Sequence, residues 1–487
     1  MTKKRCNVLI IGFGPTGSVL ANLLSKYDIS VNVLEKEREL YNLPRAVHFD
    51  DEVMRIFHNI GIFEKLIKKT IINKGTKFVD DKDNLILDWP RPKQITENGF
   101  YPSYRFHQPD LEKILRKNLT FNSNIKIEYD VELVKIFNQK KSVKAQYVDK
   151  KTKTLKTIYS DYLVGCDGAN SFVRNFVTSE VIDFGFEEKW AVIDLILKKN
   201  IKNLPDRTIQ YCSKKTPVTY CRNVGKRRRW EISLKKNLKD EEILEESNIW
   251  NFLSKWISPN DADLERKTIY TFKSLIAKKW SKGRVFIAGD AAHQSPPFMG
   301  QGMCAGIRDV SNLFWKIAYS CKYGHRQTLL DTYETERFEN VKQYIKTTIN
   351  MGKLLNSLGN SNVSDTVKEN EDGSKIMTSI KPPLGPGLGC AKDNLRGEIF
   401  PYLELSKYEK SSFDKFYDKE MVLLSKKNFN NKKIKNINIT NYSEVTNLFN
   451  ELHIDALVVR PDRYILSSLK KGDDLSDFVD ETIPKII

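Results

Sequence analysis

Residues 283–318 contain the glycines and prolines best suited to leave backbone amides open to an anion. The spacing predicts a short apolar strand at 284–288, a turn at Gly289 and Asp290, and a helix from Gly300 onward with one buried face. Prolines and glycines before the helix, including Gly302, leave its first backbone amides uncovered. Because the helix dipole adds positive character there, we expect these amides to hold an anion, either a phosphate or the delocalised charge of a reduced ring.

A second anion-binding pattern opens the chain. An apolar strand at 7–11 runs into GFGPTG, a helix follows, and a second strand at 31–34 ends at an acid. This setting is typical of a dinucleotide site, in which glycines admit a pyrophosphate and the acid accepts from ribose hydroxyls; the alternative is an ordinary turn between strand and helix. The predicted contacts are Gly12, Gly14, Pro15, Thr16, Gly17, Glu35 and Lys36.

Five further residues are candidates because of their neighbours. Arg45 and His48 precede a predicted helix, Gln108 precedes another, and Asp167 and Arg174 lie in the turn GCDGANSFVR. Each also has a structural alternative: an interior histidine for His48, a helix cap for Gln108, and a tight Asp-Gly turn for Asp167.

Composition limits the classes of partner. The 80 Lys and Arg against 62 Asp and Glu give a net charge of +18, but the lysines are spread along the chain, so we expect no nucleic-acid partner. Seven cysteines without a CxxC pair indicate reduced thiols, a cytoplasmic location and no metal site. No apolar run approaches the roughly 18 residues that span a membrane.

The pattern of elements predicts a mixed α/β chain of several domains. A nucleotide fold is interrupted by a β-rich domain and followed by a loop-rich stretch and a tail of strands and helices. The predicted boundaries are 1–180 for the first part of the nucleotide-binding domain, with strands of the β-rich domain near 76–108, then 181–280 for the β-rich domain, 281–355 for the second part, 356–397 for a linker and 398–487 for the tail.

Three motifs in a fixed order resemble those of the single-component FAD-dependent aromatic hydroxylases, the class A flavoprotein monooxygenases. They are IGFGPTGSVLANLL with VLEKE, GCDGANSFVR, and GRVFIAGDAAHQSPPFMGQGMCAGIRD. Through PRAVHFDDEVMRIF, FHQPDLE, RRRWEISL and PPLGPGLG the chain resembles the 3-(3-hydroxyphenyl)propionate hydroxylases more closely. The resemblance implies a Rossmann-like FAD-binding domain of the para-hydroxybenzoate hydroxylase type, an inserted β-sheet substrate domain and a thioredoxin-like tail without its redox pair.

The resemblance also implies cofactors and their contacts. FAD would lie on the first glycine turn, with its ribityl chain at Gly289 and Asp290 and its N1–C2=O edge at the amides near Gly300, Gly302 and Met303. NADH or NADPH would approach near Arg45 and the turn that carries Asp167 and Arg174, with Gln108 close to the cofactor. Oxygen would pass from a flavin C4a-hydroperoxide to a small phenol that resembles 3-(3-hydroxyphenyl)propionate.

For the phenol itself, the resemblance suggests His48 as the group that orients or deprotonates it. Gln108 and the carbonyl of Pro297 would lie near the ring, and Tyr211 and Tyr220 are weaker candidates. Two alternatives remain open: a larger polycyclic or antibiotic-like substrate, and a flavin protein that acts as an uncoupled NAD(P)H oxidase. A homodimer is also compatible with the sequence.

Overall fold

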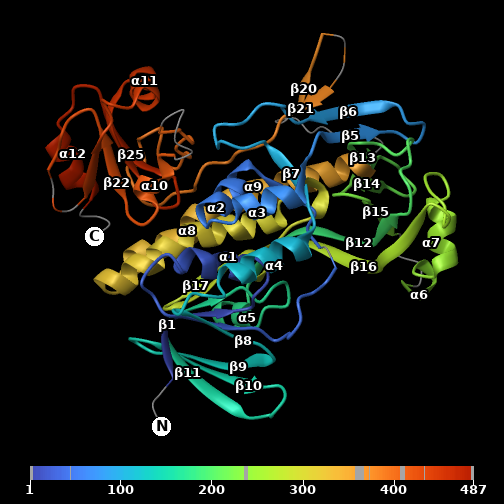
Figure 1. The fold of residues 1–487 in the computed structure, drawn as a ribbon, viewed down its shortest axis with the longest axis horizontal. Coiled ribbons are helices and arrows are strands. Elements are labelled where there is room, and N and C mark those ends of the chain that lie inside the picture. The colour runs from blue at the N-terminus through green and yellow to red at the C-terminus, as the bar shows by residue number, and fades with distance from the viewer. Residues whose placement is uncertain are drawn as a thin grey trace.

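The computed structural model describes residues 4–43, 45–234, 240–356, 367–371, 373, 375–405, 412–430, 432 and 434–483. Figure 1 shows three parts: a nucleotide-binding domain, a large, mainly antiparallel sheet on one side of it, and a small C-terminal domain on the other. Two long helices, α8 and α9, run between the large sheet and the C-terminal domain.

The nucleotide-binding sheet is parallel at its centre, in the order β18-β11-β1-β2-β8. Because consecutive parallel strands need a crossover, α1 connects β1 to β2 and places the glycine turn at the carboxyl edge of β1. The elements of this part are β1 (Arg5–Ile11), α1 (Pro15–Leu24), β2 (Val31–Leu34), β8 (Ile125–Glu128), β9 (Val131–Asn138), β10 (Val143–Asp149), β11 (Leu155–Gly165), α5 (Phe172–Val177), β17 (Ser281–Lys282) and β18 (Val285–Ile287).

Helix α1 packs on β1 and β2 of this sheet, and further helices pack in turn on α1. Both α4 (Gln108–Asn118) and α8 (Gly302–Tyr323) contact α1, α9 (Gln327–Asn356) contacts α8, and a 3-10 turn at Gly289–Ala291 precedes α8. The sequence predicted one buried face for α8, but every residue from Cys304 to Ala318 is buried. The prediction was too narrow because α8 packs on α1 and on α9, and is also contacted by the C-terminal domain.

The large sheet has ten strands in the order β19-β16-β12-β15-β14-β13-β5-β6-β21-β20. Its last two strands come from the stretch 356–397, expected as a linker, so part of that stretch extends the sheet. The elements are β5 (Gly75–Val79), β6 (Leu85–Pro90), β12 (Val181–Leu197), β13 (Thr208–Tyr211), β14 (Val218–Arg222), β15 (Arg227–Leu234), α6 (Asp240–Ile243), α7 (Glu246–Leu253), β16 (Ala262–Ala277), β19 (His293–Gln294), β20 (Val367–Glu369) and β21 (Lys375–Met377).

A three-stranded sheet joins these two parts. It consists of β3 (His48–Asp50), β7 (Ser103–Phe106) and β4 (Thr70–Ile72). Strand β3 continues into α2 (Asp51–Asn59), whose first turn is capped by the side chain of Asp50, and α3 (Phe63–Leu66) and a 3-10 turn (Ile67–Lys69) lead on to β4. This small sheet therefore places two candidate segments, around His48 and around Gln108, side by side.

The C-terminal domain has its own sheet and core. Its strands run in the order β23-β22-β24-β25, with β22 and β23 parallel and the other pairs antiparallel. The elements are α10 (Asp414–Tyr417), β22 (Val422–Ser425), β23 (Lys435–Asn438), α11 (Ser443–Glu451), β24 (Ile454–Val459), β25 (Ile465–Lys470) and α12 (Leu475–Thr482). In the described part of the segment 426–434 between β22 and β23, no helix forms. Across the described ranges, no helix is both long and apolar enough to traverse a bilayer.

Candidate active site

The first glycine turn has the geometry that a dinucleotide site requires. Gly12 has a φ of +93°, and a Cβ there would lie 2.5 Å from the carbonyl oxygen of Cys166. A Cβ on Gly17 would lie 2.1 Å from the carbonyl oxygen of Gly12, so these two glycines are required by the packing of the chain itself. Gly14 differs, because a Cβ there would meet no atom within 4 Å. The space beside Gly14 suits a bound group that approaches the backbone closely.

The predicted acid lies across this turn. Glu35 accepts a hydrogen bond from the amide of Phe13 at 2.6 Å and another from the amide of Glu37 at 2.9 Å. Its side chain is half-buried at the end of β2, where ribose hydroxyls would reach it, whereas the neighbouring Lys36 is exposed. The start of α1 carries no side-chain cap, so its amides are free for a phosphate.

The second predicted anion site packs directly against the first. Gly289 has a φ of +64°, and Cβ atoms on Gly289 and Gly306 would lie 2.7 and 2.6 Å from Oγ1 of Thr16. Thr16 is therefore wedged between α8 and the turn before it. The next residue, Asp290, is exposed to solvent, yet desolvation by the surrounding protein raises its pKa. A carboxylate that solvent reaches and protein surrounds lies in a recess.

Asp167 and Arg174 fix this recess from the other side. Asp167 accepts from the hydroxyl of Ser171 at 2.5 Å and from the amide of Val173 at 3.1 Å, so it orders the start of α5. Arg174, on α5, donates to the carbonyl oxygens of Asp290 and Ala291, both at 3.3 Å. Asp167 thus acts on Arg174 only through Ser171 and the helix. Gly168 has a φ of +78°, so the tight Asp-Gly turn, the structural alternative for Asp167, is also present.

The amino terminus of α8 is open. Gly300 has a φ of +66° and ends the 3-10 turn at Pro297–Met299. The helix begins at Gly302 with no side-chain cap, and Gly302 and Met303 are half-exposed. The amides of this first turn can therefore donate to an anion, as the sequence predicted.

Gln108 has a structural task that the sequence did not specify. Its side-chain oxygen accepts from the backbone amides of Arg45 and Ala46 at 3.1 and 2.7 Å, and its amide nitrogen donates to Glu112 at 2.8 Å. These hydrogen bonds fix the backbone of the loop that carries Arg45 to the start of α4. The Arg45 guanidinium lies 4.6 Å from the ring centroid of Tyr41, and its charge is close enough to Asp290 to oppose part of the rise in the pKa of that carboxyl.

His48 is buried where β3 meets the loop before α8. Its Nδ1 lies 3.3 Å from the carbonyl oxygen of Gly300, and a carbonyl can only accept, so Nδ1 carries the hydrogen. Burial lowers the pKa of His48 to about 3, with Arg105 and Arg91 adding to the effect. The ring is therefore neutral at ordinary pH, and the bare Nε2 has no hydrogen-bond partner among the described residues.

Contacts between the small sheet, the large sheet and the loop before α8 close into a ring that includes His48. Arg105 is the cross-strand neighbour of His48 on β7, and it donates to the hydroxyl of Thr208 on β13. Two residues further along β13, Gln210 donates to the carbonyl oxygen of Phe298 at 3.4 Å. Phe298 lies in the same turn as Gly300, whose carbonyl oxygen contacts His48, so the chain of contacts closes. Unpartnered atoms belong to this ring: Nε2 of His48, Nε of Arg105 and Oε1 of Gln210.

Two weaker candidates were wrong. Tyr211 accepts from the indole of Trp256 at 3.0 Å, and the ring of Tyr220 packs on Trp230 while its hydroxyl donates to Pro205. Both tyrosines pack in the core beneath α7, on the face of the sheet away from His48. Strand side chains alternate, so on β13 the residues that reach the ring around His48 are Thr208 and Gln210 instead. The Pro297 carbonyl accepts from the amide of Gly300 at 2.8 Å, within its own turn.

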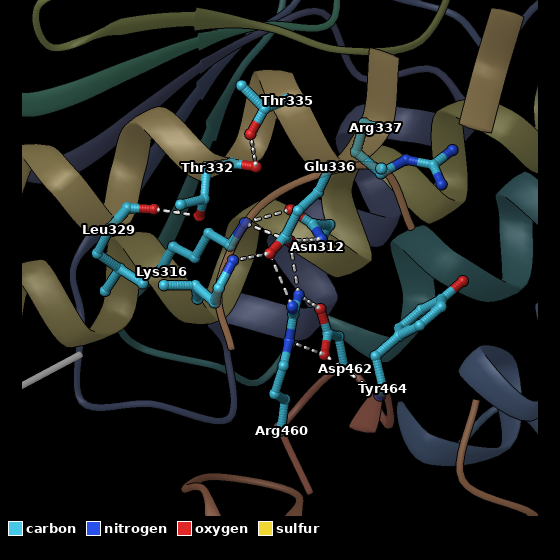
Figure 2. A network of polar contacts seen from close by, with 12 residues as sticks. Asn312, Lys316, Leu329, Thr332, Thr335, Glu336, Arg337, Arg460, Asp462 and Tyr464 are labelled. Carbon is cyan, nitrogen blue, oxygen red and sulfur yellow. Dashed lines mark hydrogen bonds and ion pairs between the residues drawn. The ribbon is translucent and has the colours of Figure 1, made fainter. Parts of the chain in front are cut away.

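Beneath α8 lies a buried ionic network that the sequence did not reveal. Figure 2 shows Glu336 of α9 at its centre, bound by Lys316 of α8 at 2.8 Å and by Arg460 of the C-terminal domain through two bonds of 2.9 Å. Arg460 also contacts Asp462 at 2.6 Å. The network holds the C-terminal domain to the two long helices.

A second buried chain of polar contacts runs from that domain to the site. Tyr464 donates to Glu52 at 2.8 Å, Glu52 pairs with Arg308, and Arg308 pairs with Asp50 at 2.6 Å, two residues from His48. Arg308 and Arg105 were not among the residues predicted from the sequence; the signal that could have indicated them is a charged residue inside an otherwise apolar helix or strand pattern.

Comparisons with known proteins identify the family of this chain. The family model described as FAD binding domain matches residues 5–348. A probable NADH-specific resorcinol 4-hydroxylase of Rhodococcus jostii (strain RHA1) is 37% identical over 358 residues, which are 72% of this chain and 66% of that protein. A 3-(3-hydroxy-phenyl)propionate/3-hydroxycinnamic acid hydroxylase of Shigella sonnei (strain Ss046) is 30% identical over 353 residues, 72% of this chain and 62% of that protein. The chain thus spans less than two thirds of the length of these relatives.

Solved structures share the fold over the whole chain. The flavin-dependent monooxygenase PieE, in complex with FAD and substrate, has a TM-score of 0.78 and 16% identity, covering 99% of this chain and 98% of that one. Aklavinone-11 hydroxylase, in a ternary complex with FAD and aklavinone, has a TM-score of 0.76 and 16% identity, covering 100% and 99%. At this identity the likeness shows the fold alone.

Proposed function

We propose that this chain, which belongs to the FAD binding domain family, is an FAD-dependent monooxygenase that consumes NADH or NADPH and hydroxylates a small phenol. One observation carries the proposal: a neutral, buried histidine with a bare ring nitrogen lies against the loop that opens the uncapped helix α8. A phenol can donate its hydrogen to that nitrogen beside the place where the helix amides would hold a flavin.

The described residues fit FAD. The open space beside Gly14 and the uncapped start of α1 suit the pyrophosphate, and Glu35 suits the ribose. Asp290, in its recess, suits the ribityl hydroxyls, and the free amides of Gly302 and Met303 suit negative charge on the reduced ring. When bound, the flavin supplies the exchange of electrons with the nicotinamide and the activation of dioxygen. Arg45 and Arg174, whose charges both act on Asp290, are our candidates for contacts to NADH.

Within this reaction His48 orients the phenol. A histidine whose pKa burial lowers to about 3 is a weak base, so it accepts a hydrogen bond and does not carry the proton away. The bond from Nδ1 to Gly300 holds the ring so that Nε2 points away from that loop. Accepting the phenol hydrogen makes the phenol oxygen, and with it the ring carbons, richer in electrons, as hydroxylation requires.

The site must also exclude water. His48 and Gln210 are 4% and 2% exposed, and Phe298, Trp190 and Met299 form an apolar wall beside them. A dry site protects reactive oxygen species from hydrolysis and strengthens each polar contact. The large sheet supplies Trp190 and Gln210 to this cover, and the turn before α8 supplies Phe298 and Met299.

Two substrate types follow from the relatives: resorcinol, and a phenol with an acidic side chain such as 3-(3-hydroxyphenyl)propionate. We propose to measure NADH oxidation by the FAD-loaded protein with each phenol and with neither, and to score hydroxylated product against hydrogen peroxide. We expect oxidation to accelerate with a phenol and to yield hydroxylated product. Phenol-independent oxidation that yields only peroxide would instead identify an uncoupled NADH oxidase.

The matched variant is His48→Gln, which keeps a neutral polar side chain but moves the acceptor. We expect it to bind FAD normally, to oxidise NADH and to lose most of its coupling to hydroxylation. A His48→Gln protein with full coupling would remove His48 from the reaction.

A further inference from the structure

Arg105 is a buried cation without an acidic partner. Its side chain lies within the small sheet at 7% exposure, and no carboxylate of the described residues lies within ion-pair distance of it. Its contact is with the hydroxyl of Thr208, and its Nε has no partner. Burial accordingly lowers the pKa of Arg105. A buried guanidinium in this condition destabilises the fold unless something compensates it.

A second guanidinium lies nearby. Arg91 stacks over the ring of Trp89 at 4.0 Å and donates to the hydroxyl of Ser379, while its Nε also lacks a partner. Burial and the charge of Arg105 together lower the pKa of Arg91 to about 10. Both arginines also lower the pKa of His48, so the three side chains surround one region.

The neighbouring acids are already engaged. Asp50 pairs with Arg308 at 2.6 Å, and Asp51 accepts from Thr96 and Asn98. Glu231, the acid that acts most on Arg105, lies 3.5 Å from Arg229. None of these acids lies within ion-pair distance of Arg105 or Arg91 in the described part of the chain.

We infer that Arg105, assisted by Arg91, binds the carboxylate of an aromatic acid substrate while His48 holds its phenol hydroxyl. The inference rests on the proposed function and specifies its substrate class: hydroxyaryl acids, in preference to uncharged phenols such as resorcinol. The division of labour follows from the atoms: bare Nε2 of His48 can only accept, and the guanidinium of Arg105 can only donate. A phenol with a separate carboxylate satisfies both, and guanidinium groups bind carboxylates with directed, charge-assisted bonds.

The test compares two ligands that differ only in charge: 3-(3-hydroxyphenyl)propionate and its primary amide. Equilibrium binding to the FAD-loaded protein is followed through the flavin absorbance, without turnover. We expect the acid to bind about 30-fold or more tightly than the amide, as for a buried charge pair. In Arg105→Met the ratio of acid affinity to amide affinity should fall toward one, because the acid binds more weakly while the affinity for the amide changes little. Arg105→Lys should keep part of the preference because it keeps the charge.

The matched control is Arg326→Met, an exposed arginine outside the site, which should keep the wild-type ratio. Thermal unfolding checks the fold: Arg105→Met should be no less stable than the wild type, since it removes an uncompensated buried charge. Three results would overturn the inference: no acid preference in the wild type, a preference that survives in Arg105→Met, or an equal loss of both ligands, which would assign Arg105 to the phenol oxygen.

Turnover separates this inference from the proposed function. An acid preference that depends on Arg105, without hydroxylated product, would support the subsite and contradict the hydroxylase. Coupled hydroxylation of resorcinol without any preference for the acid would support the hydroxylase and contradict the carboxylate subsite.

Discussion

Replacing Gly14 by alanine separates the needs of the fold from those of the cofactor. Gly14 has φ −70° and ψ −171°, an extended conformation open to any residue, and a Cβ there meets nothing within 4 Å. The chain itself therefore does not require glycine at this position. Because alanine restricts the unfolded chain, we expect the Gly14→Ala apoprotein to be as stable as the wild type or more stable by about 0.4–1 kcal/mol.

The cofactor should respond in the opposite direction. The added methyl would occupy the space in which a pyrophosphate approaches the start of α1. Loss of one charge-assisted hydrogen bond costs about 1.5–3 kcal/mol, which corresponds to FAD binding weaker by about 10- to 150-fold. Gly17→Ala provides the contrast: its Cβ would lie 2.1 Å from the carbonyl oxygen of Gly12, so the fold itself should fail.

Two measurements on the Gly14→Ala protein decide the matter: urea unfolding of the apoprotein, and titration of FAD followed by quenching of flavin fluorescence. Unchanged FAD affinity would refute the assignment of Gly14 to the cofactor. A marked loss of apoprotein stability would refute the argument that the chain leaves this space open.

Three further predictions concern buried charge. The pKa of His48 in the fold, about 3, lies below its ordinary value, so the unfolded chain binds a proton first and the stability of the fold falls as pH drops below about 6.5. When urea unfolding is compared at pH 6.5 and 4.5, the free energy of unfolding of His48→Gln should fall by about 2–3 kcal/mol less than that of the wild type. Burial lowers the pKa of Lys316 to about 8, so its contribution to stability rises between pH 8 and about 10.5, and Lys316→Met should lack that rise when the two proteins are unfolded across this range. Asp414 of the C-terminal domain pairs with Arg55 of α2 at 2.7 Å and with Arg463 at 2.9 Å, so this buried cluster also joins that domain to the nucleotide-binding part. Asp414→Ala would leave both arginines buried without their carboxylate, and we expect a loss of about 3–5 kcal/mol in thermal unfolding; a loss below about 1 kcal/mol would contradict a stabilising role for the cluster.

The nucleotide fold could be predicted because its signals are local. The glycine turn, the helix after it and the acid at the end of β2 lie within one short segment, and each has a direct geometric reason in the structure, such as the positive φ of Gly12. The turn at Gly289 and the open start of α8 are equally local. The family model and the relatives agree with this part of the prediction.

The surroundings of His48 could not be predicted in the same way. The choice between Gln210 and Tyr211 depends on which face of β13 meets the nucleotide domain, and a shift of one residue reverses it. The pairing of Arg105 with His48 depends on the register of two strands far apart in the chain.

The sequence by itself predicted a dinucleotide-binding turn near the start of the chain, the glycines expected to contact the cofactor and the helix start expected to face its ring, because backbone conformation and short-range periodicity encode these features. Only the tertiary structure decided that His48 is neutral, that Arg105 has no acid beside it, and that both belong to one ring of contacts with β13 and the loop before α8. Those properties arise from desolvation and from pairing between distant segments, and neither is written in the local order of residues.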